Sequence, residues 1–197
     1  MSHYYQASFI KSSPRLRDAP EDKGREIAFM GRSNAGKSSV INVITNQNSL
    51  ARTSKTPGRT QQMNFFALGQ EQRLVDFPGL GFARVSEQQR QAWQHTLIDY
   101  LTNRQSLQGI MLITDIRHAP TKWDEELLSL SEYHQIPVHI LLNKSDKLKR
   151  GPAQNILKSL QGLFAGPVSL QTFSATKRVG VDLAHQHMDR WIHPDED

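Results

Sequence analysis

The chain reads Gly31-Arg32-Ser33-Asn34-Ala35-Gly36-Lys37-Ser38 at residues 31–38. It matches the phosphate-loop pattern Gly-x-x-x-x-Gly-Lys-[Ser/Thr] at every fixed position. Its glycines allow backbone N–H groups to close around a chain of phosphates. Lys37 would place a positive charge on the terminal phosphates, and Ser38 would supply an oxygen to Mg²⁺. The pattern therefore predicts a site for a nucleoside triphosphate.

The residues on either side of this loop support the prediction. Residues 26–30 form a largely apolar run typical of a strand, and Val40, Ile41 and Ile44 repeat at helical spacing after the loop. A strand, a glycine-rich loop and a helix N-terminus together point several N–H groups at an anion.

The rest of the chain continues this alternation of strands and helices. Residues 63–68 and 72–76 predict two strands joined at Gly69 as an antiparallel hairpin. Strands that alternate with helices indicate a mostly parallel sheet covered on both faces. We therefore expect an α/β, three-layer phosphate-loop fold with a six-stranded, mostly parallel sheet, one antiparallel edge strand and helices on both faces. The remaining strands are predicted at residues 109–114, 138–142 and 168–173, the first of them from a continuous apolar run.

Length and composition indicate one domain. We expect residues 1–25 to form a flexible N-terminal arm, pinned to the body by Phe9 and Ile10, residues 26–193 to form the domain, and residues 194–197 to be a tail. Ser86 and Thr121 are placed to begin helices, each with a side chain three residues later that completes a capping box. The polar stretch 46–62 has no periodicity and predicts a mobile loop.

The composition limits which cell compartment and which binding partners we expect. The chain has no cysteine, which fits a reducing compartment. Its start lacks a signal-peptide pattern and no apolar run approaches the length of a membrane span, so we expect a cytoplasmic protein. The net charge of +5 and the sequence pI of about 9.6 favour RNA or a ribonucleoprotein as the partner.

Asp76-Phe77-Pro78-Gly79 follows the predicted strand 72–76. An aspartate at this position would hold Mg²⁺, through a water or directly, while the Gly79 N–H would bond a terminal phosphate. The alternative is a plain turn, but the position after a strand and downstream of the phosphate loop favours the functional interpretation.

Asn143-Lys144-Ser145-Asp146 follows the predicted strand 138–142 and predicts which base is bound. The Asp146 carboxylate only accepts hydrogen bonds, and guanine offers two adjacent donors, its N1–H and its exocyclic amino group. Adenine would turn a lone pair toward the carboxylate, which would leave a buried charge unpaired. Asn143 would bond the base and the neighbouring loop, and the Lys144 stem would lie over the ring.

Two weaker segments complete the pattern. Residues Phe173-Ser174-Ala175 end the last strand, where small side chains let the backbone approach the base and the Ala175 N–H would donate to guanine O6. In the loop 46–62, a threonine would reach Mg²⁺ when a terminal phosphate is present and release it after hydrolysis. The residues alone do not choose between Thr56 and Thr60.

These five elements, in this order, are similar to those of translation-factor-type, small GTPase-like proteins. The three stretches Gly31–Ser38, Lys55-Thr56-Pro57-Gly58-Arg59-Thr60-Gln61 and the run from Asp76 to Ala83 resemble the bacterial EngB (YihA/YsxC) family over nearly the whole chain. The resemblance implies GTP hydrolysis, a role in assembling the large ribosomal subunit from rRNA and ribosomal proteins, and a link to cell division and septation. We expect the protein to be a monomer. The resemblance implies Lys37, Thr60 and Gly79 as catalytic residues, and it places Thr60 on Mg²⁺ beside Ser38 and Asp76. The GTP-binding residues so implied are Gly31, Arg32, Ser33, Asn34, Ala35, Gly36, Lys37, Ser38, Gly58, Arg59, Thr60, Gln61, Gln62, Asp76, Phe77, Pro78, Gly79, Asn143, Lys144, Ser145, Asp146, Phe173, Ser174 and Ala175.

One position after Asp-x-x-Gly differs from the residue found in Ras-like enzymes. Ras-like enzymes place a water-orienting glutamine after Asp-x-x-Gly, and here that position is Leu80, which neither donates nor accepts a hydrogen bond. We therefore expect slow hydrolysis without an activator. In related GTPases an asparagine at the position of Asn34 ligates K⁺, so K⁺ would complete the site; the alternative is that Asn34 only shapes the loop. Arg59 is a weaker candidate for supplying this charge.

Two other functions compete with a GTP-driven switch. The first is a phosphate-loop kinase or ATPase with a small substrate, which the guanine-selecting stretch 143–146 disfavours. The second is an RNA-binding module in which the nucleotide is only structural. Asp115 follows a buried strand and is expected to cap a turn, and His185 and His187 are not expected to form a metal site.

Overall fold

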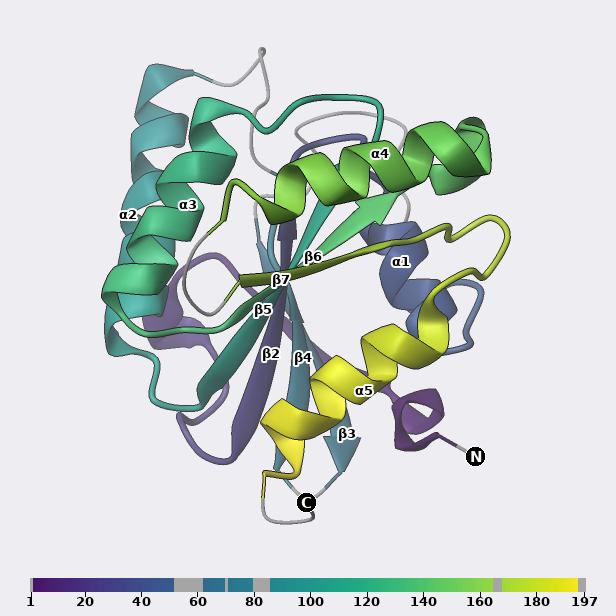
Figure 1. The fold of residues 1–197 in the computed structure, drawn as a ribbon. Coiled ribbons are helices and arrows are strands. Elements are labelled where there is room, and N and C mark those ends of the chain that lie inside the picture. The colour runs from purple at the N-terminus through teal and green to yellow at the C-terminus, as the bar shows by residue number, and fades with distance from the viewer. Residues whose placement is uncertain (1, 52–61, 70, 80–85, 165–167, 195–197) are drawn as a thin grey trace.

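A seven-stranded sheet forms the centre of the computed structural model, which describes residues 2–51, 62–69, 71–79, 86–164 and 168–194 (Figure 1). The strand order is β1-β3-β4-β2-β5-β6-β7. The strands are β1 (Ser8–Ser13), β2 (Arg25–Gly31), β3 (Met63–Gly69), β4 (Gln72–Asp76), β5 (Leu107–Asp115), β6 (Val138–Asn143) and β7 (Val168–Thr172).

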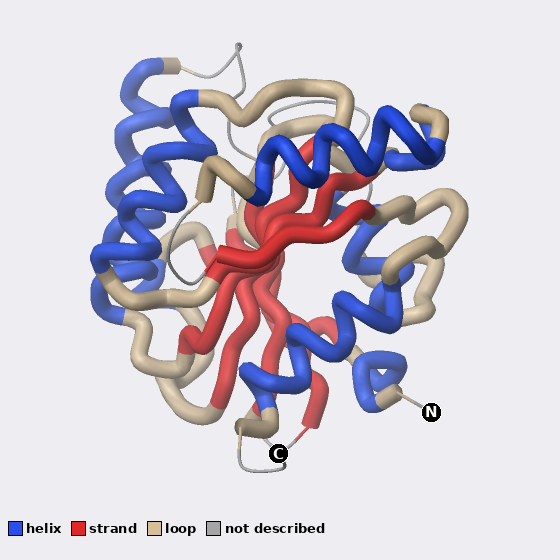
Figure 2. The backbone as a smooth tube through the Cα atoms, viewed as in Figure 1, coloured by secondary structure: helices blue, strands red, loops and turns tan. Residues whose placement is uncertain are grey.

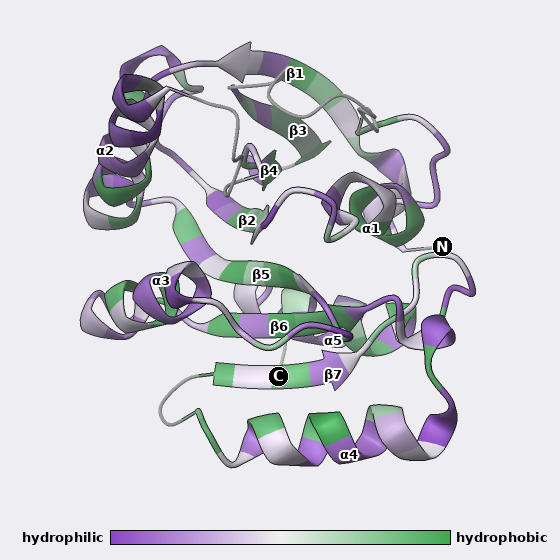
Figure 3. Ribbon diagram, turned by 90° about the horizontal axis from the view of Figure 1, so that it is seen from above, coloured by the Kyte–Doolittle hydropathy of each residue, from purple (hydrophilic) through white to green (hydrophobic). Residues whose placement is uncertain are grey.

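Helices cover both faces of this sheet (Figures 2 and 3). One apolar cluster joins the sheet to α2, α3 and α4, and a second joins the opposite face to α1 and α5. The α-helices are α1 (Lys37–Ile44), α2 (Glu87–Asn103), α3 (Lys122–Tyr133), α4 (Arg150–Gln161) and α5 (Val181–Ile192), and short 3₁₀ helices are η1 (His3–Gln6), η2 (Leu16–Asp18) and η3 (Ser145–Lys147). In the described part of the chain, no helix has the length and apolar character needed to cross a membrane.

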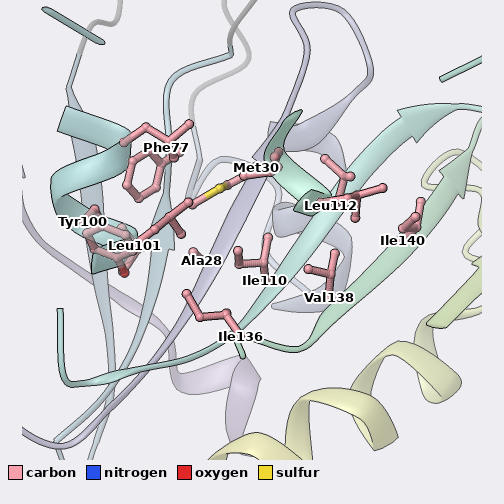
Figure 4. Close-up of a cluster of buried hydrophobic side chains, with 14 of the residues drawn as sticks. Ala28, Met30, Phe77, Tyr100, Leu101, Ile110, Leu112, Ile136, Val138 and Ile140 are labelled. Atoms are coloured by element: carbon pink, nitrogen blue, oxygen red, sulfur yellow. The ribbon is translucent and has the colours of Figure 1, made fainter. Parts of the chain in front are cut away.

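Alternation along the central strands assigns side chains to the two clusters. In β2, Ala28 and Met30 face the α2–α3 side, while Ile27 and Phe29 face the α1–α5 side. Figure 4 shows Ala28 and Met30 beside Ile110 and the helix α2 residues Tyr100 and Leu101. A strand buried on both faces needs apolar residues at every position, which explains the continuous apolar runs from which the sequence predicted the parallel strands.

The sheet has one strand more than the six that we predicted. β1 lies within residues 1–25, which we expected to form a flexible arm, and it pairs antiparallel with β3 along the edge. Because β3 is also antiparallel to β4, β3 is the reversed strand, and it lies second from the edge. Ser8, Phe9, Ile10 and Lys11 are all exposed, so β1 has no buried face that a sequence pattern could reveal.

The N-terminus is fastened by a residue other than those expected. Phe9 is 57% exposed and Ile10 42% exposed, so neither anchors the segment firmly. Tyr4 is fully buried instead, and its hydroxyl donates a hydrogen bond to Asp189 of α5 at 2.7 Å. The predicted capping box at the start of α3 is confirmed, since the Thr121 N–H donates to Asp124 Oδ2 at 2.8 Å.

A buried cluster of charges ties the sheet to α2 at the start of β2. Glu26 is fully buried, and its carboxylate accepts from Arg73 Nε of β4 at 2.7 Å and from Arg104 Nη2 at 2.6 Å. Arg104 Nε and the Tyr100 hydroxyl donate to the second carboxylate oxygen, each at 3.0 Å. One carboxylate therefore satisfies two guanidinium groups that folding has removed from water.

Replacing Glu26 with Gln should lower the free energy of unfolding by about 3 kcal/mol, because the substitution keeps the shape but removes the buried carboxylate that contacts both guanidinium groups, and Arg104 keeps only the more distant Asp22 at 3.5 Å among the described carboxylates. Urea unfolding followed by circular dichroism measures this change. Glu126→Gln, which removes a carboxylate from an exposed pair with Lys122 on α3, is the matched control and should change stability by less than about 0.5 kcal/mol. A loss below about 1 kcal/mol for Glu26→Gln would contradict the assignment of this cluster as a stabilising centre.

Candidate functional site

The predicted site residues that the structure describes gather at one edge of the sheet. The phosphate loop follows β2, Asp76 ends β4, Asn143 ends β6, and residues 173–175 follow β7. These four strands are parallel, so their carboxyl ends meet at the same edge. This edge is where ligands bind in open α/β sheets.

The phosphate loop has backbone positions that only small residues fit. Gly36 has φ 95°, in the left-handed region, and a Cβ there would lie 2.5 Å from Asn143 Nδ2. Gly79 faces the loop from the other side, and a Cβ on it would lie 3.2 Å from the Ser33 backbone nitrogen. The two glycines therefore bring the ends of β2, β4 and β6 closer together than side chains would allow.

The start of α1 offers N–H groups to a ligand. Among the described residues, the first N–H of this helix that finds a carbonyl acceptor is that of Val40, which bonds to Gly36 O at 2.9 Å. The N–H groups before it point out of the helix end, as helix geometry requires. Phosphate oxygens would accept from these N–H groups and would also be stabilised by the helix dipole.

Lys37 and Asp76 form a buried ion pair at the base of this loop. Burial lowers the pKa of the Lys37 ammonium to about 7. Asp76 therefore lies against the residue that precedes Ser38 in the chain. The Asp76 carboxylate and the Ser38 hydroxyl are oxygen donors of the kind that Mg²⁺ binds, and Mg²⁺ usually takes its other ligands from phosphates and water. No group of three or more His, Asp or Glu side chains in the described segments could hold a metal by itself.

Asn143 connects the phosphate loop to the last loop. Its Nδ2 donates to Ala35 O at 2.8 Å, and its Oδ1 accepts from the Ala175 N–H at 3.2 Å. The expected bond to the neighbouring loop is therefore present. The Ala175 N–H, which we expected to donate to guanine O6, is already used by Asn143, because the Asn143 amide spans the distance between the two loops.

Asp146 is presented as a charged acceptor. Its Oδ1 accepts from the Ser174 hydroxyl at 2.5 Å, and Lys147 Nζ lies 3.6 Å from its Oδ2. The Ser174 hydrogen bond holds the pKa of the Asp146 carboxyl below its usual value. The Ser145 N–H donates to Phe173 O at 3.0 Å, which keeps the two loops together. The carboxylate is therefore ionised and oriented before any base arrives.

Some predicted binding residues belong to the core. Phe77 is 1% exposed and packs edge-on against Tyr100, with ring centroids 4.6 Å apart (Figure 4). Phe173 is fully buried in the cluster on the other face. Any contact of these two residues with a nucleotide would come from their backbone. Arg32 and Asn34 are exposed, and Asn34 has φ 66°.

The structure adds two residues to which we assigned no role at the site. Asp115 ends β5 beside Asn143 in the β5–β6 register, and its carboxylate pairs with Arg117 and with Lys144 Nζ, the latter at 3.0 Å. The only sequence signal was a charged residue directly after a buried strand, which by itself also fits a turn.

Most of the predicted switch-loop residues lie outside the described part of the chain. Gln62 is described and exposed just before β3. The other predicted residues of the loop 46–62, and Leu80 at the position of the Ras-like glutamine, are not among the described residues: Thr56, Gly58, Arg59, Thr60, Gln61 and Leu80.

Known proteins agree with this architecture. The family model described as "50S ribosome-binding GTPase" matches residues 26–144. The chain is 48% identical over 192 residues to the probable GTP-binding protein EngB of Hydrogenovibrio crunogenus, which covers 96% of this chain and 91% of that protein. It is 46% identical over 193 residues to the protein of the same description from Escherichia coli O139:H28, covering 96% of this chain and 92% of that protein.

A solved structure shares the fold as well. The crystal structure of a probable GTP-binding protein EngB superposes with a TM-score of 0.70 at 22% identity, and the match covers 86% of this chain and 99% of that chain. The family model spans the strands that carry the phosphate loop, Asp76 and Asn143, and the two relatives span almost the whole chain. The chain therefore belongs to the EngB family of P-loop GTP-binding proteins.

Proposed function

We propose that this chain is a slow, Mg²⁺-dependent GTPase that acts in the cytoplasm as a nucleotide switch in assembly of the large ribosomal subunit, and that normal cell division and septation require it. The observation that carries the proposal is that a chain of the EngB family has both a phosphate loop and an Asp146 carboxylate that is ionised and oriented. The family model's description, a ribosome-binding GTPase, supports the ribosomal part.

Guanine selection follows from the chemistry of Asp146. The carboxylate would accept from the N1–H and amino groups of guanine, while Asn143 fixes the loop against which the base lies. The Lys144 stem would cover one face of the ring. Adenine offers no donor at N1, so its binding would leave the charged acceptor unpaired.

Hydrolysis would proceed by attack of water on the γ-phosphate. Lys37 and the Gly79 N–H would neutralise and bind the oxygens on which charge develops, and Ser38, Thr60 and Asp76 would hold Mg²⁺, Asp76 through a water. Bound Mg²⁺ would supply further positive charge to the β- and γ-phosphate oxygens. Because Leu80 stands where a glutamine orients water in Ras-like enzymes, the isolated protein would turn over slowly.

The surface near the site suits a ribosomal partner. Five basic side chains in the segments that follow β6 and β7 are exposed, and rRNA phosphates would pair with them. Because this charge lies next to the guanine loops, the bound nucleotide would influence it directly. The protein would act as a monomer on the large subunit or its precursor. These basic residues are Lys147, Lys149, Arg150, Lys177 and Arg178.

Asp146→Asn should weaken GTP binding by about 100-fold, because an amide cannot accept from both guanine donors as the charged carboxylate does. The same variant should bind xanthosine triphosphate better than wild type, since xanthine carries a carbonyl where guanine carries the amino group. Fluorescence titration with both nucleotides measures this exchange of preference. Asp182→Asn, at an exposed position of α5, is the matched control and should leave both affinities unchanged. Equal weakening for both nucleotides would refute the base-reading role of Asp146.

Co-sedimentation with ribosomal subunits tests the switch. The GTP-analogue state should sediment with the large subunit, and the GDP and nucleotide-free states should bind it at least about tenfold more weakly, as expected of a switch worth about 1.4 kcal/mol. Equal binding in all three states, at every salt concentration tested, would exclude the switch and favour a plain RNA-binding module. Competition by ATP against labelled GTP would instead favour a kinase or ATPase.

Replacing Na⁺ with K⁺ at constant ionic strength should raise the GTP turnover rate about tenfold or more, if Asn34 holds K⁺ beside the phosphates as a substitute for an arginine finger. Asn34→Ala should abolish the difference between the two cations while retaining GTP binding. Phosphate release measured in each salt decides the question. Identical wild-type rates in K⁺ and Na⁺ would eliminate the potassium role and leave Asn34 as a residue that shapes the loop.

A further inference from the structure

Asp115 is fixed by its neighbour Arg117. Asp115 Oδ1 accepts from the Arg117 backbone N–H at 3.1 Å and from Arg117 Nε at 2.9 Å, and Oδ2 accepts from Arg117 Nη2 at 2.6 Å. This two-pronged contact sets the plane of the carboxylate as well as its position. The Arg117 guanidinium also holds the pKa of the Asp115 carboxyl well below its usual range, so the carboxylate stays charged at neutral pH.

The oriented carboxylate holds Lys144. Lys144 Nζ lies 3.0 Å from Asp115 Oδ2 and donates to Asn34 O of the phosphate loop at 2.6 Å. The Lys144 backbone is left-handed, with φ 62°. A lysine side chain normally samples many rotamers, and fixing it costs conformational entropy. Here the ammonium is held at two points, so the direction of the stem is set before a ligand binds.

We propose that Asp115 and Arg117 are positioning residues of the nucleotide site, which slow the release of bound guanine nucleotide by holding Lys144 across the phosphate loop. The inference rests on the guanine site proposed above. It goes further because neither residue would touch the nucleotide, and both act through the Lys144 side chain. Arg117 contributes from a half-exposed position, with 42% of its side chain accessible.

The release rate is the quantity that this arrangement should control. A nucleotide that leaves the site would have to give up its contact with the Lys144 stem, and a pre-ordered stem loses less entropy when it packs on the base. Changes of this kind within one site are expressed mainly in the dissociation rate. Because the stem would lie on the face of the ring, its effect should not depend on the hydrogen-bonding edge, which Asp146 reads.

This distinction yields a readout that general damage to the site would not give. Asp115→Asn should raise the dissociation rates of GDP and inosine diphosphate by the same factor, about tenfold, which is typical for the loss of a charge-assisted hydrogen bond. Inosine diphosphate lacks the exocyclic amino group, so Asp146→Asn should change the two rates by different factors. Stopped-flow displacement of fluorescent derivatives of both nucleotides measures all of these rates.

A double-mutant cycle tests whether Asp115 acts through Lys144. Lys144→Met should itself speed release, and adding Asp115→Asn to it should change the rate by less than about twofold, because the group that Asp115 holds is gone. Arg117→Ala should speed release about two- to threefold in wild type, since the 117 backbone N–H still supports Asp115. It should have no further effect in the Lys144→Met background.

The controls separate this inference from the guanine site on which it rests. Glu126→Gln, which removes a carboxylate from a surface ion pair, should release both nucleotides at the wild-type rate. If wild-type protein failed to bind fluorescent GDP, the guanine site itself would be wrong. If wild type bound GDP but Asp115→Asn released it at the wild-type rate, or if the effects of Asp115→Asn and Lys144→Met multiplied, the positioning role would be overturned.

Discussion

Asn143 joins three loops that leave three different strands. Its carboxamide donates to Ala35 O of the phosphate loop and accepts from the Ala175 N–H, and its backbone carbonyl accepts from the Ile116 N–H at 3.0 Å. The side chain is buried, so losing one partner would leave a polar group without water or protein to satisfy it. The phosphate end and the base end of the site are therefore held at a fixed separation. Gly36 makes this possible, because any side chain there would collide with the Asn143 amide.

Most of the sheet could be predicted because its strands are buried on both faces. The runs at residues 109–114 and 138–142 are apolar at nearly every position, and they became the centres of β5 and β6. β1 could not be recognised in this way. Most of its residues are exposed, so they show no alternation of buried and exposed positions. The strand forms because the edge of β3, about 50 residues later, is open to it, and local propensity contains no information on that edge.

Some residues of the site could likewise be predicted from the sequence, and others could not. The phosphate loop and the stretch 143–146 have fixed residue types because backbone geometry and base chemistry demand them, so their positions at the sheet edge followed from the strands. The role of Asp115 depends instead on the parallel register that sets it beside Asn143 and on the left-handed turn that returns Lys144 over the loop. Neither the register nor the turn could be predicted from the residue types alone. The use of the Ala175 N–H by Asn143 is likewise a matter of distances that only the folded chain defines.

Tyr4 and Asp189 are 185 positions apart, yet their side chains are hydrogen-bonded. Tyr4 also stacks on His185, with ring centroids 4.7 Å apart. Synthesis runs from the N-terminus toward the C-terminus, so Tyr4 is made well before α5. The contact closes a loop of 185 positions, and closing a loop costs more entropy the longer it is. The N-terminal segment can therefore take its final place only after residues 181–192 have left the ribosome.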